Sequence, residues 1–245
     1  FEKHAYGNTE LSDLLVELEA TSGRDLSWFS SEWLETAGVN TLTADFDVDG
    51  EGRFTRFEVV QSAPEQWPTL RTHRLGIGIY ALTGEGALER REFVELDVTG
   101  ERTSVEQLIG TERGDLVLLN DGDLTYAKIR LDDDSTRTLI EHFDDLTDPL
   151  ARAVAWTSFW EATRDAELPA QDYVALVLAG LPSETDMAAV STLLAQAGNA
   201  AAFARSYGFA SACEYGADSD PQVPNLSGAA LRFANTGGQA LLTNR

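Results

Sequence analysis

The sequence predicts an α+β multidomain fragment with three successive parts: a helical lead-in, an antiparallel β-sandwich and α-solenoid-like helices. Apolar residues recur at helical spacing over residues 1–37, alternate every second residue from Val39 to Leu131, and return to helical spacing from Ser135 to about Ala197. Spacings of 3.6 and 2 are those of a helix face and a strand face. With 43% apolar residues, the chain can bury a substantial core.

In the lead-in, a helix is expected after Gly7-Asn8, with Thr9 or Ser12 accepting a backbone N–H at its start. Gly23 suits the left-handed residue that ends such a helix. Asp25 can begin a second helix, which Gly38 ends. The apolar faces of the two helices are Leu11, Leu14, Leu15 and Leu18, then Leu26, Phe29 and Trp33. The first eight residues resemble the end of a helix that starts before Phe1.

The second part contains short strands separated by Asp-Gly, Gly-Glu-Gly and Asn-Asp-Gly turns. The expected strands cover 40–48, 53–61, 70–82, 89–98, 115–119 and 124–131. Side chains expected to share a face are Leu75, Ile77, Ile79 and Ala81; Val94, Leu96 and Val98; and Thr125, Ala127, Ile129 and Leu131. Six to eight short strands in succession favour an antiparallel sandwich. No βαβ pattern is present, which disfavours a parallel dinucleotide-binding sheet.

In the third part we expect helices over 135–144, 149–165, 169–180 and 186–196. Pro149 and Pro169 suit the first turn of a helix, where a missing N–H costs nothing. Helices of this length with short connections are typical of stacked antiparallel pairs. Residues 198–245 differ in composition: their few charges cancel, so the net charge of −23 comes from residues 1–197. The expected domains are therefore 1–38, 39–132 and 133–197, followed by an unplaced tail over 198–245.

Charge and cysteine content exclude several function classes. A net charge of −23 without a Lys/Arg cluster repels nucleic acid and anionic lipid, so neither is expected as a partner. No run of about 18 apolar residues is present for a membrane span. Cys213 is the only cysteine, which excludes an internal disulfide or a thiolate cluster and fits a reducing cytoplasm.

The sharpest local motif, Asp45-Phe-Asp47-Val-Asp49-Gly50, matches the first half of a calcium-binding EF-hand loop. The twelfth position of that loop requires a bidentate Glu, and here it is Arg56, whose charge repels the ion. The following residues also have strand character. A β-hairpin whose Asp-Gly turn allows positive φ is therefore favoured over a calcium site.

The other chemical motifs are incomplete. His4, His73 and His142 are far apart, and neither a His-Glu-x-x-His pair nor a Gly-x-Ser-x-Gly elbow occurs. Gly76-Ile-Gly78 and Gly84-Glu-Gly86 lack a third fingerprint glycine, and glycines within a strand more often mark close backbone approach. Two acidic runs could bind a cation but are interpreted as a solvated strand end, at Asp132-Asp133-Asp134, and a helix boundary, at Asp144-Asp145. The aromatic residues Trp156, Phe159 and Trp160 have helical spacing and are interpreted as part of the core.

Three stretches together resemble the aminopeptidase N family of zinc metallopeptidases, in its actinobacterial form. FEKHAYGNTELSDLLVELEATSGRDLSWFSSEWLETAGVNTL resembles the last helices of the catalytic domain. GDLVLLNDGDLTYAKIRLDDDS resembles the end of the β-sandwich domain, and DPLARAVAWTSFWEATRDAELPAQDYVALVLAGLPSETDMAAVSTLLAQ the start of the C-terminal helical domain. The order of the three is that of the family, and the resemblance covers roughly residues 1–197.

The resemblance implies a parent enzyme that removes N-terminal amino acids from peptides with zinc held by a His-Glu-x-x-His…Glu site. None of those residues has a matching position here, so no catalytic, cofactor-binding or metal-binding residue is assigned. Two hypotheses follow: a non-catalytic scaffold portion of a zinc aminopeptidase, or a stand-alone protein-interaction module of β-sandwich and helical repeats. If the catalytic domain is missing, the apolar faces around Leu11, Leu15, Trp28 and Trp33 are expected to be exposed.

Overall fold

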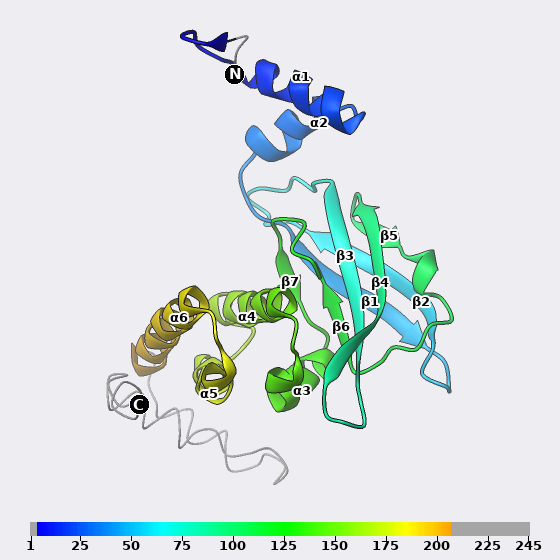
Figure 1. Ribbon diagram of the computed structural model, residues 1–245, viewed down its shortest axis with the longest axis vertical. Helices are drawn as coiled ribbons and strands as arrows, with labels where there is room; N and C mark the ends of the chain where they lie inside the picture. Colours follow the sequence, from blue (N-terminus) through cyan, green and yellow to red (C-terminus); the bar gives the residue numbers. More distant parts are fainter. Residues whose placement is uncertain (1–3, 207–245) are drawn as a thin grey trace.

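The computed structural model describes residues 4–206, and the lead-in extends away from a body of two sheets and a group of helices (Figure 1). The lead-in consists of α1 (Leu11–Ser22), α2 (Ser27–Phe29) and the π-helical turn η2 (Ser30–Leu34). Gly23 ends α1 in the left-handed conformation at φ 68°, as expected. The start differs from expectation: Glu10, not Thr9 or Ser12, is the cap, and it forms a reciprocal capping box with Asp13.

Seven strands form two sheets, one with the order β5-β2-β1-β7 and one with the order β4-β3-β6. The strands are β1 (Thr41–Val48), β2 (Phe54–Ser62), β3 (His73–Leu82), β4 (Leu88–Val98), β5 (Arg102–Ser104), β6 (Leu116–Leu119) and β7 (Lys128–Arg130). All six expected strands are present, and the short edge strand β5 was not expected. The pairings are antiparallel except that of β1 with β7, which is parallel. The expectation of a wholly antiparallel arrangement is therefore wrong at this pair.

One apolar cluster contains side chains from both sheets. It joins Leu42, Phe57 and Val59 of the four-stranded sheet to alternate residues of β3 and β6, among them Ile77 and Leu119. The expected inward face of β3 is buried at Leu75, Ile77 and Ile79, but Ala81 is half-exposed. The alternation of β3 continues to its end, because Tyr80 and Leu82 pack on the opposite face, against the cluster shared with the helices. The extra residue at the register shift is Arg91 of β4.

Helices cover part of the other face of the three-stranded sheet, over β6 and the adjoining ends of β3 and β4. These helices are α3 (Asp133–His142), α4 (Pro149–Arg164), α5 (Ala170–Gly180) and α6 (Met187–Ser206). A second apolar cluster joins Tyr80, Leu116 and Leu118 of this sheet to the helices, and Trp156 and Phe159 lie within it. Trp160 packs against the same cluster, which confirms the assignment of these aromatic residues to the core.

Capping residues set the starts of α3 and α4. Asp132 accepts the N–H of Ser135, and Asp148 accepts two N–H groups at the start of α4, where Pro149 occupies the first turn as expected. Pro169 instead occupies the cap position of α5. Among the described residues, no helix combines the length and apolar character needed to cross a bilayer.

The third part extends beyond the expected boundary at residue 197. α6 continues to Ser206, and Ala197, Ala200 and Ala201 are buried against the other helices. The expected tail of 198–245 therefore begins as helix, and residues 207–245, including Cys213, lie outside the described residues.

Gly76 and Gly78 lie where another segment comes close to β3, as expected. A Cβ atom on Gly76 would lie 2.0 Å from the carbonyl oxygen of Asp121, and one on Gly78 would lie 2.1 Å from Oδ2 of the same residue. Asp121 is almost fully buried and accepts hydrogen bonds from Tyr80 and Arg90. The glycines therefore provide the space in which a buried carboxylate meets its partners.

We predict that Gly78→Ala destabilises the protein, because the added methyl displaces a carboxylate that is hydrogen-bonded on two sides. Overpacking of this kind costs about 1–3 kcal/mol of unfolding free energy, which urea denaturation measures. The matched control is Gly84→Ala in the β3–β4 turn, where no atom lies within 4 Å of the added Cβ. The control is expected to change stability by less than about 0.5 kcal/mol. Equal losses in the two variants would contradict the close-approach interpretation.

Candidate functional site

The three histidines lie in separate places, as their spacing suggested. His4 is 3.7 Å from Asp13 beside α1, and His142 Nδ1 is 2.9 Å from Asp145 at the end of α3. His73 is buried at the start of β3. Within residues 4–206, no group of three or more His, Cys, Asp or Glu side chains is arranged to hold a metal ion.

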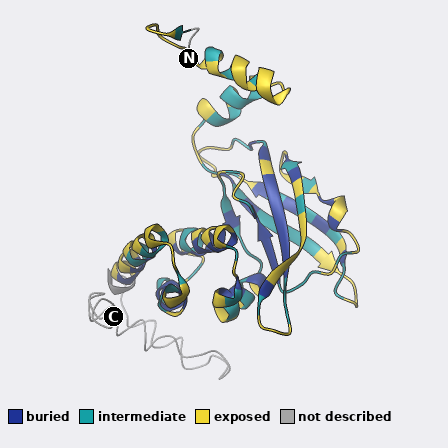
Figure 2. Ribbon diagram, in the orientation of Figure 1, coloured by how far each residue is buried: buried dark blue, intermediate teal, exposed yellow. Residues whose placement is uncertain are grey.

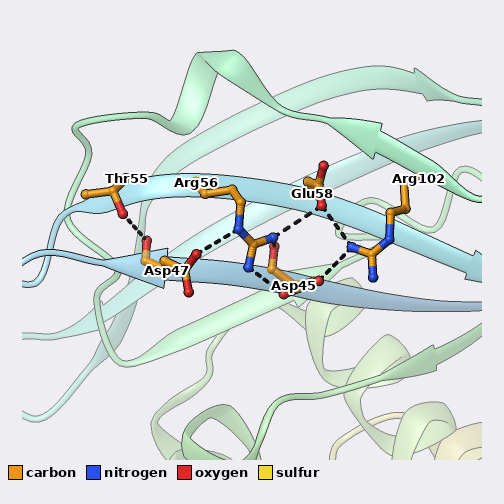
Figure 3. Close-up of polar contacts among 6 residues, drawn as sticks. All are labelled: Asp45, Asp47, Thr55, Arg56, Glu58 and Arg102. Carbon is orange, nitrogen blue, oxygen red and sulfur yellow. Dashed lines mark hydrogen bonds and ion pairs between the residues drawn. The ribbon is translucent and has the colours of Figure 1, made fainter.

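The Asp45–Gly50 motif forms the β1–β2 hairpin, and Arg56 holds both of its first two carboxylates (Figure 3). Its guanidinium is 2.8 Å from Asp45 and 2.7 Å from Asp47. Arg102 adds a second cation, 2.7 Å from Asp45 and 2.8 Å from Glu58 (Figure 3). Hydrogen bonds from Arg56 and then Arg102 lower the pKa of Asp45 to about 2. Two arginines thus occupy the carboxylates that calcium would need.

Asp49 closes the hairpin turn through its own backbone. Its Oδ1 accepts the N–H groups of Glu51 at 2.8 Å and Arg53 at 2.9 Å, and hydrogen bonding led by Arg53 lowers the pKa of Asp49. The residue with positive φ is Gly52, at 77°, rather than Gly50. The hairpin hypothesis is confirmed, and the position of the glycine that permits the turn is corrected.

The two acidic runs serve local structure. In the first, Asp132 caps α3 and forms an ion pair with Arg113 at 2.6 Å. In the second, Asp144 accepts the hydroxyl of Ser183 at 2.6 Å, and Asp145 pairs with His142. This confirms their assignment to a strand end and a helix boundary.

The most extensive buried polar arrangement joins the lead-in to the sheets. We call it the junction cluster: Glu32, Thr36, Asn40, Gln61, Arg71, His73 and Thr125. Arg71, only 4% exposed, donates to the carbonyl of Glu32 at 2.7 Å, the hydroxyl of Thr36 at 3.0 Å and the carbonyl of Ala37 at 3.0 Å. Carbonyls at the end of a helix lack partners within the helix and attract a cation. Arg71 therefore fastens the end of the lead-in to the start of β3.

His73 belongs to the same cluster as Arg71, and the hydrogen-bond partners of its ring determine which tautomer it adopts. Nε2 is 3.2 Å from Oδ1 of Asn40 and 3.1 Å from Oε1 of Gln61, while both amide nitrogens donate to backbone carbonyls. Because Nε2 faces two acceptors, it carries the proton, and Nδ1 accepts the hydroxyl of Thr125 at 2.7 Å. Burial, and then the charge of Arg71, lowers the pKa of His73 to about 4. The ring is therefore neutral at pH 7.

The outer end of the lead-in exposes apolar side chains. Leu11, Leu14 and Leu18, which we call the lead-in surface, are exposed, and α1 contains no buried residue (Figure 2). The expectation of exposure holds for Leu11, but Leu15, Trp28 and Trp33 are half-buried. Trp33 stacks edge-on against His73 with ring centroids 5.1 Å apart. Contiguous exposed apolar residues are typical of an interaction surface.

The sequence interpretation named His73 and Thr125 of the junction cluster but did not single out the others. A signal was available: Arg71 and His73 continue the alternation of Leu75, Ile77 and Ile79 toward the start of the strand. Extending that alternation by two steps places both polar residues on the inward face. Gln61 gave the same signal, because it continues the alternation of Phe57 and Val59, and Asn40 lies two residues before the buried Leu42. What the sequence could not give is that these residues meet Arg71 and His73, because those contacts are distant in sequence.

Similarity to known proteins covers most of the chain. Residues 116–214 match the family described as ERAP1-like C-terminal domain. Over 199 residues the chain is 51% identical to an Aminopeptidase N of Streptomyces lividans, an alignment that covers 79% of this chain. The chain spans only 23% of the length of that relative. Among solved structures, Legionella pneumophila aminopeptidase A in complex with aspartic acid matches with a TM-score of 0.40 and 16% identity, covering 97% of this chain and 31% of that one.

We predict that the β1–β2 hairpin does not bind calcium above the level of any acidic surface, because Arg56 and Arg102 neutralise its carboxylates. Isothermal titration calorimetry at physiological ionic strength is expected to give no saturable heat. A micromolar one-to-one isotherm that Asp47→Ala abolishes would be incompatible with the ladder of ion pairs in Figure 3.

We also predict that His73 makes stability depend on pH between about 4 and 6.5. The unfolded chain binds a proton near pH 6.5 and the folded chain only near 4, so stability is complete above 6.5 and falls as pH decreases. The difference corresponds to about 3 kcal/mol of unfolding free energy. Urea denaturation at intervals of pH should show this slope reduced in His73→Gln.

The control variant is Gly84→Ala, because it adds a methyl group with no atom within 4 Å and changes no titratable group. It should retain the slope of the unmodified chain between pH 4 and 6.5. If His73→Gln keeps the full slope, groups other than His73 account for it.

Proposed function

We propose that this chain, a relative of the aminopeptidase N family, supplies the non-catalytic scaffold portion of a zinc aminopeptidase that removes N-terminal amino acids from peptides. The observation that carries the proposal is the 51% identity over 199 residues to an Aminopeptidase N of which the chain spans 23%. The chain contains no His-Glu-x-x-His sequence. Zinc and peptide substrate would therefore bind in the rest of such an enzyme.

The domain assignment is part of this proposal. Residues 1–38 would be the last helices of the catalytic domain, residues 39–132 a β-sandwich domain, and residues 133–206 the start of a helical domain. The apolar cluster shared by the two sheets supports the sandwich. The helical part is supported by the packing of α4, α5 and α6 in one cluster, to which further helices could be added as in a solenoid. The family match to residues 116–214 passes the earlier boundary at 197.

The junction cluster suggests how this chain would act as a scaffold. Because Arg71 holds three groups of the lead-in while Trp33 covers His73, the end of the lead-in is fixed relative to the sheets. A catalytic domain continuous with α1 would be positioned by the same contacts. The lead-in surface would then be covered by that domain, which is the partner we propose for it. The net charge of −23 and the single cysteine fit a cytoplasmic enzyme that binds neither nucleic acid nor membrane.

The second candidate is a stand-alone protein-interaction module. The exposure of Leu11, Leu14 and Leu18 favours it, because such a surface could equally bind a separate protein. The two candidate functions can be distinguished by a replacement experiment in a related enzyme. Only a scaffold portion should substitute for the aligned segment of a working aminopeptidase.

We predict that the purified chain contains no stoichiometric zinc and does not hydrolyse a leucyl or alanyl reporter, because no metal-binding group is available within residues 4–206. Elemental analysis and a chromogenic assay measure these properties. The positive arm is a chimera in which the aligned residues of this chain replace those of the Streptomyces lividans relative, and this chimera should hydrolyse the reporter.

Arg71→Met in the chimera should lower activity, because the lead-in loses its attachment. The matched control is Arg91→Met, since Arg91 is exposed and its one ion pair within residues 4–206 is with Glu89. An inactive chimera that is folded and contains zinc would favour the interaction module. One zinc per isolated chain together with chelator-sensitive turnover would contradict both candidates.

A further inference from the structure

The lead-in surface, formed by Leu11, Leu14 and Leu18 on α1, has the spacing of a helix-packing seam. These leucines are exposed, and α1 contains no buried residue (Figure 2). Steps of three and four residues place them on one side of the helix, where the side chains of one partner helix can interlock with them. α1 has 12 residues, so the seam is about 18 Å long. Its width and length therefore fit one further helix.

Acidic residues flank this seam. Glu10 and Glu17 stand four residues before and three residues after Leu14, so both lie beside it on the surface of the helix. Both are exposed, and no lysine or arginine within residues 4–206 pairs with either of them. The charges that flank an apolar seam decide which helix pairs with it and which is repelled. The flanks of α1 therefore favour a partner with positive charge.

The excess of negative charge extends over the whole described lead-in. Residues 4–38 contain seven acidic side chains and one arginine. That arginine, Arg24, is 2.7 Å from Asp97 of β4, so a carboxylate of the sheet already matches its charge. A second copy of this chain would bring the same carboxylates against one another, and like charges at close range repel. The charge of the lead-in thus disfavours self-pairing through α1.

We propose that the lead-in surface binds one amphipathic helix whose apolar stripe is flanked by lysine or arginine. The stripe of that helix packs on Leu11, Leu14 and Leu18, and its basic flank lies against Glu10 and Glu17. The inference rests on the proposed function, in which a catalytic domain covers this surface and supplies the helix. It adds the chemical character of the covering element, which the identity to a known aminopeptidase does not give.

The test measures the binding of three synthetic peptides to the full chain by isothermal titration calorimetry at physiological ionic strength. The lysine peptide is about four helical turns long, with leucine at helical spacing and lysine elsewhere. The glutamate peptide has glutamate in place of each lysine, and the scrambled peptide has the composition of the lysine peptide in another order. The lysine peptide is expected to bind one-to-one with a Kd on the order of 100 μM, because the seam is short. The other two should bind at least about tenfold more weakly.

Leu14→Gln tests the seam. Leu14 is exposed and glutamine is a good helix former, so this variant should fold with an unchanged Tm. It should weaken binding of the lysine peptide about tenfold, the value of burying one leucine side chain. The matched control is Leu150→Gln, which removes an exposed leucine from α4 and should leave the affinity unchanged.

Glu17→Gln tests the acidic flank. It should weaken binding of the lysine peptide about two- to fivefold, the range of one ion pair at a surface. It should also reduce the preference for the lysine peptide over the glutamate peptide. The matched control is Glu141→Gln on α3, because Glu141 is exposed, forms no ion pair within the described range, and removes the same charge. This control should change neither affinity.

Several results would overturn the proposal. If Leu14→Gln leaves binding of the lysine peptide unchanged, the peptide is attracted to the acidic protein in general. If the glutamate peptide binds equally well, the basic flank has no role. Dimerisation that sedimentation velocity detects and Leu14→Gln abolishes would make a second copy the occupant. If the lysine peptide does not bind while the chimera with the Streptomyces lividans relative is active, this inference fails and the proposed function stands.

Discussion

β6 and most of β3 are buried on both faces of the three-stranded sheet, and the other parts of the molecule are arranged around that requirement. β6 shows the constraint most clearly, because all four of its residues are buried. Val117 and Leu119 belong to the cluster shared with the other sheet, whereas Leu116 and Leu118 belong to the cluster shared with the helices. A strand covered on both sides needs apolar residues at every position rather than at every second one. The helical part is thus needed to bury the outer face of this sheet.

Much of this architecture could be predicted from local pattern. The strands and helices with strong periodicity were located to within a few residues, and Gly23 marked the end of α1. What local pattern could not supply was the pairing of β1 with β7, because no residue near Thr41 specifies a partner near Lys128. α6 was cut short for a different reason. Alanine has the highest helix propensity but contributes little to a hydrophobic pattern, so the alanines around Ala200 concealed a buried helix.

The polar features were likewise predictable where the signal was local and not where it depended on residues distant in sequence. The hairpin at the Asp45–Gly50 motif was predicted correctly, because its turn residues and the strand pattern on either side are local features of the sequence. The junction cluster was not predicted as a unit, because Asn40, Gln61 and Arg71 meet only after the lead-in and two strands are in place. The Ser158 hydroxyl, which is buried without a hydrogen-bond partner among residues 4–206, is equally non-local, because the sequence does not show which groups surround it. The family resemblance supplied the functional direction that no single side chain in the described residues provides.

The parallel pairing of β1 with β7 has a consequence for how the chain is made. On the ribosome, Thr41 emerges long before Lys128, so the four-stranded sheet stays open at one edge while the intervening strands are synthesised. Pairings between distant residues form late and leave strand edges exposed in the meantime. β7 is followed within a few residues by α3, and its arrival both closes that edge and begins the helical cover. In a nascent chain stalled before residue 128, β1 would be paired with β2 on one side and would expose its other edge to neighbouring chains and to chaperones.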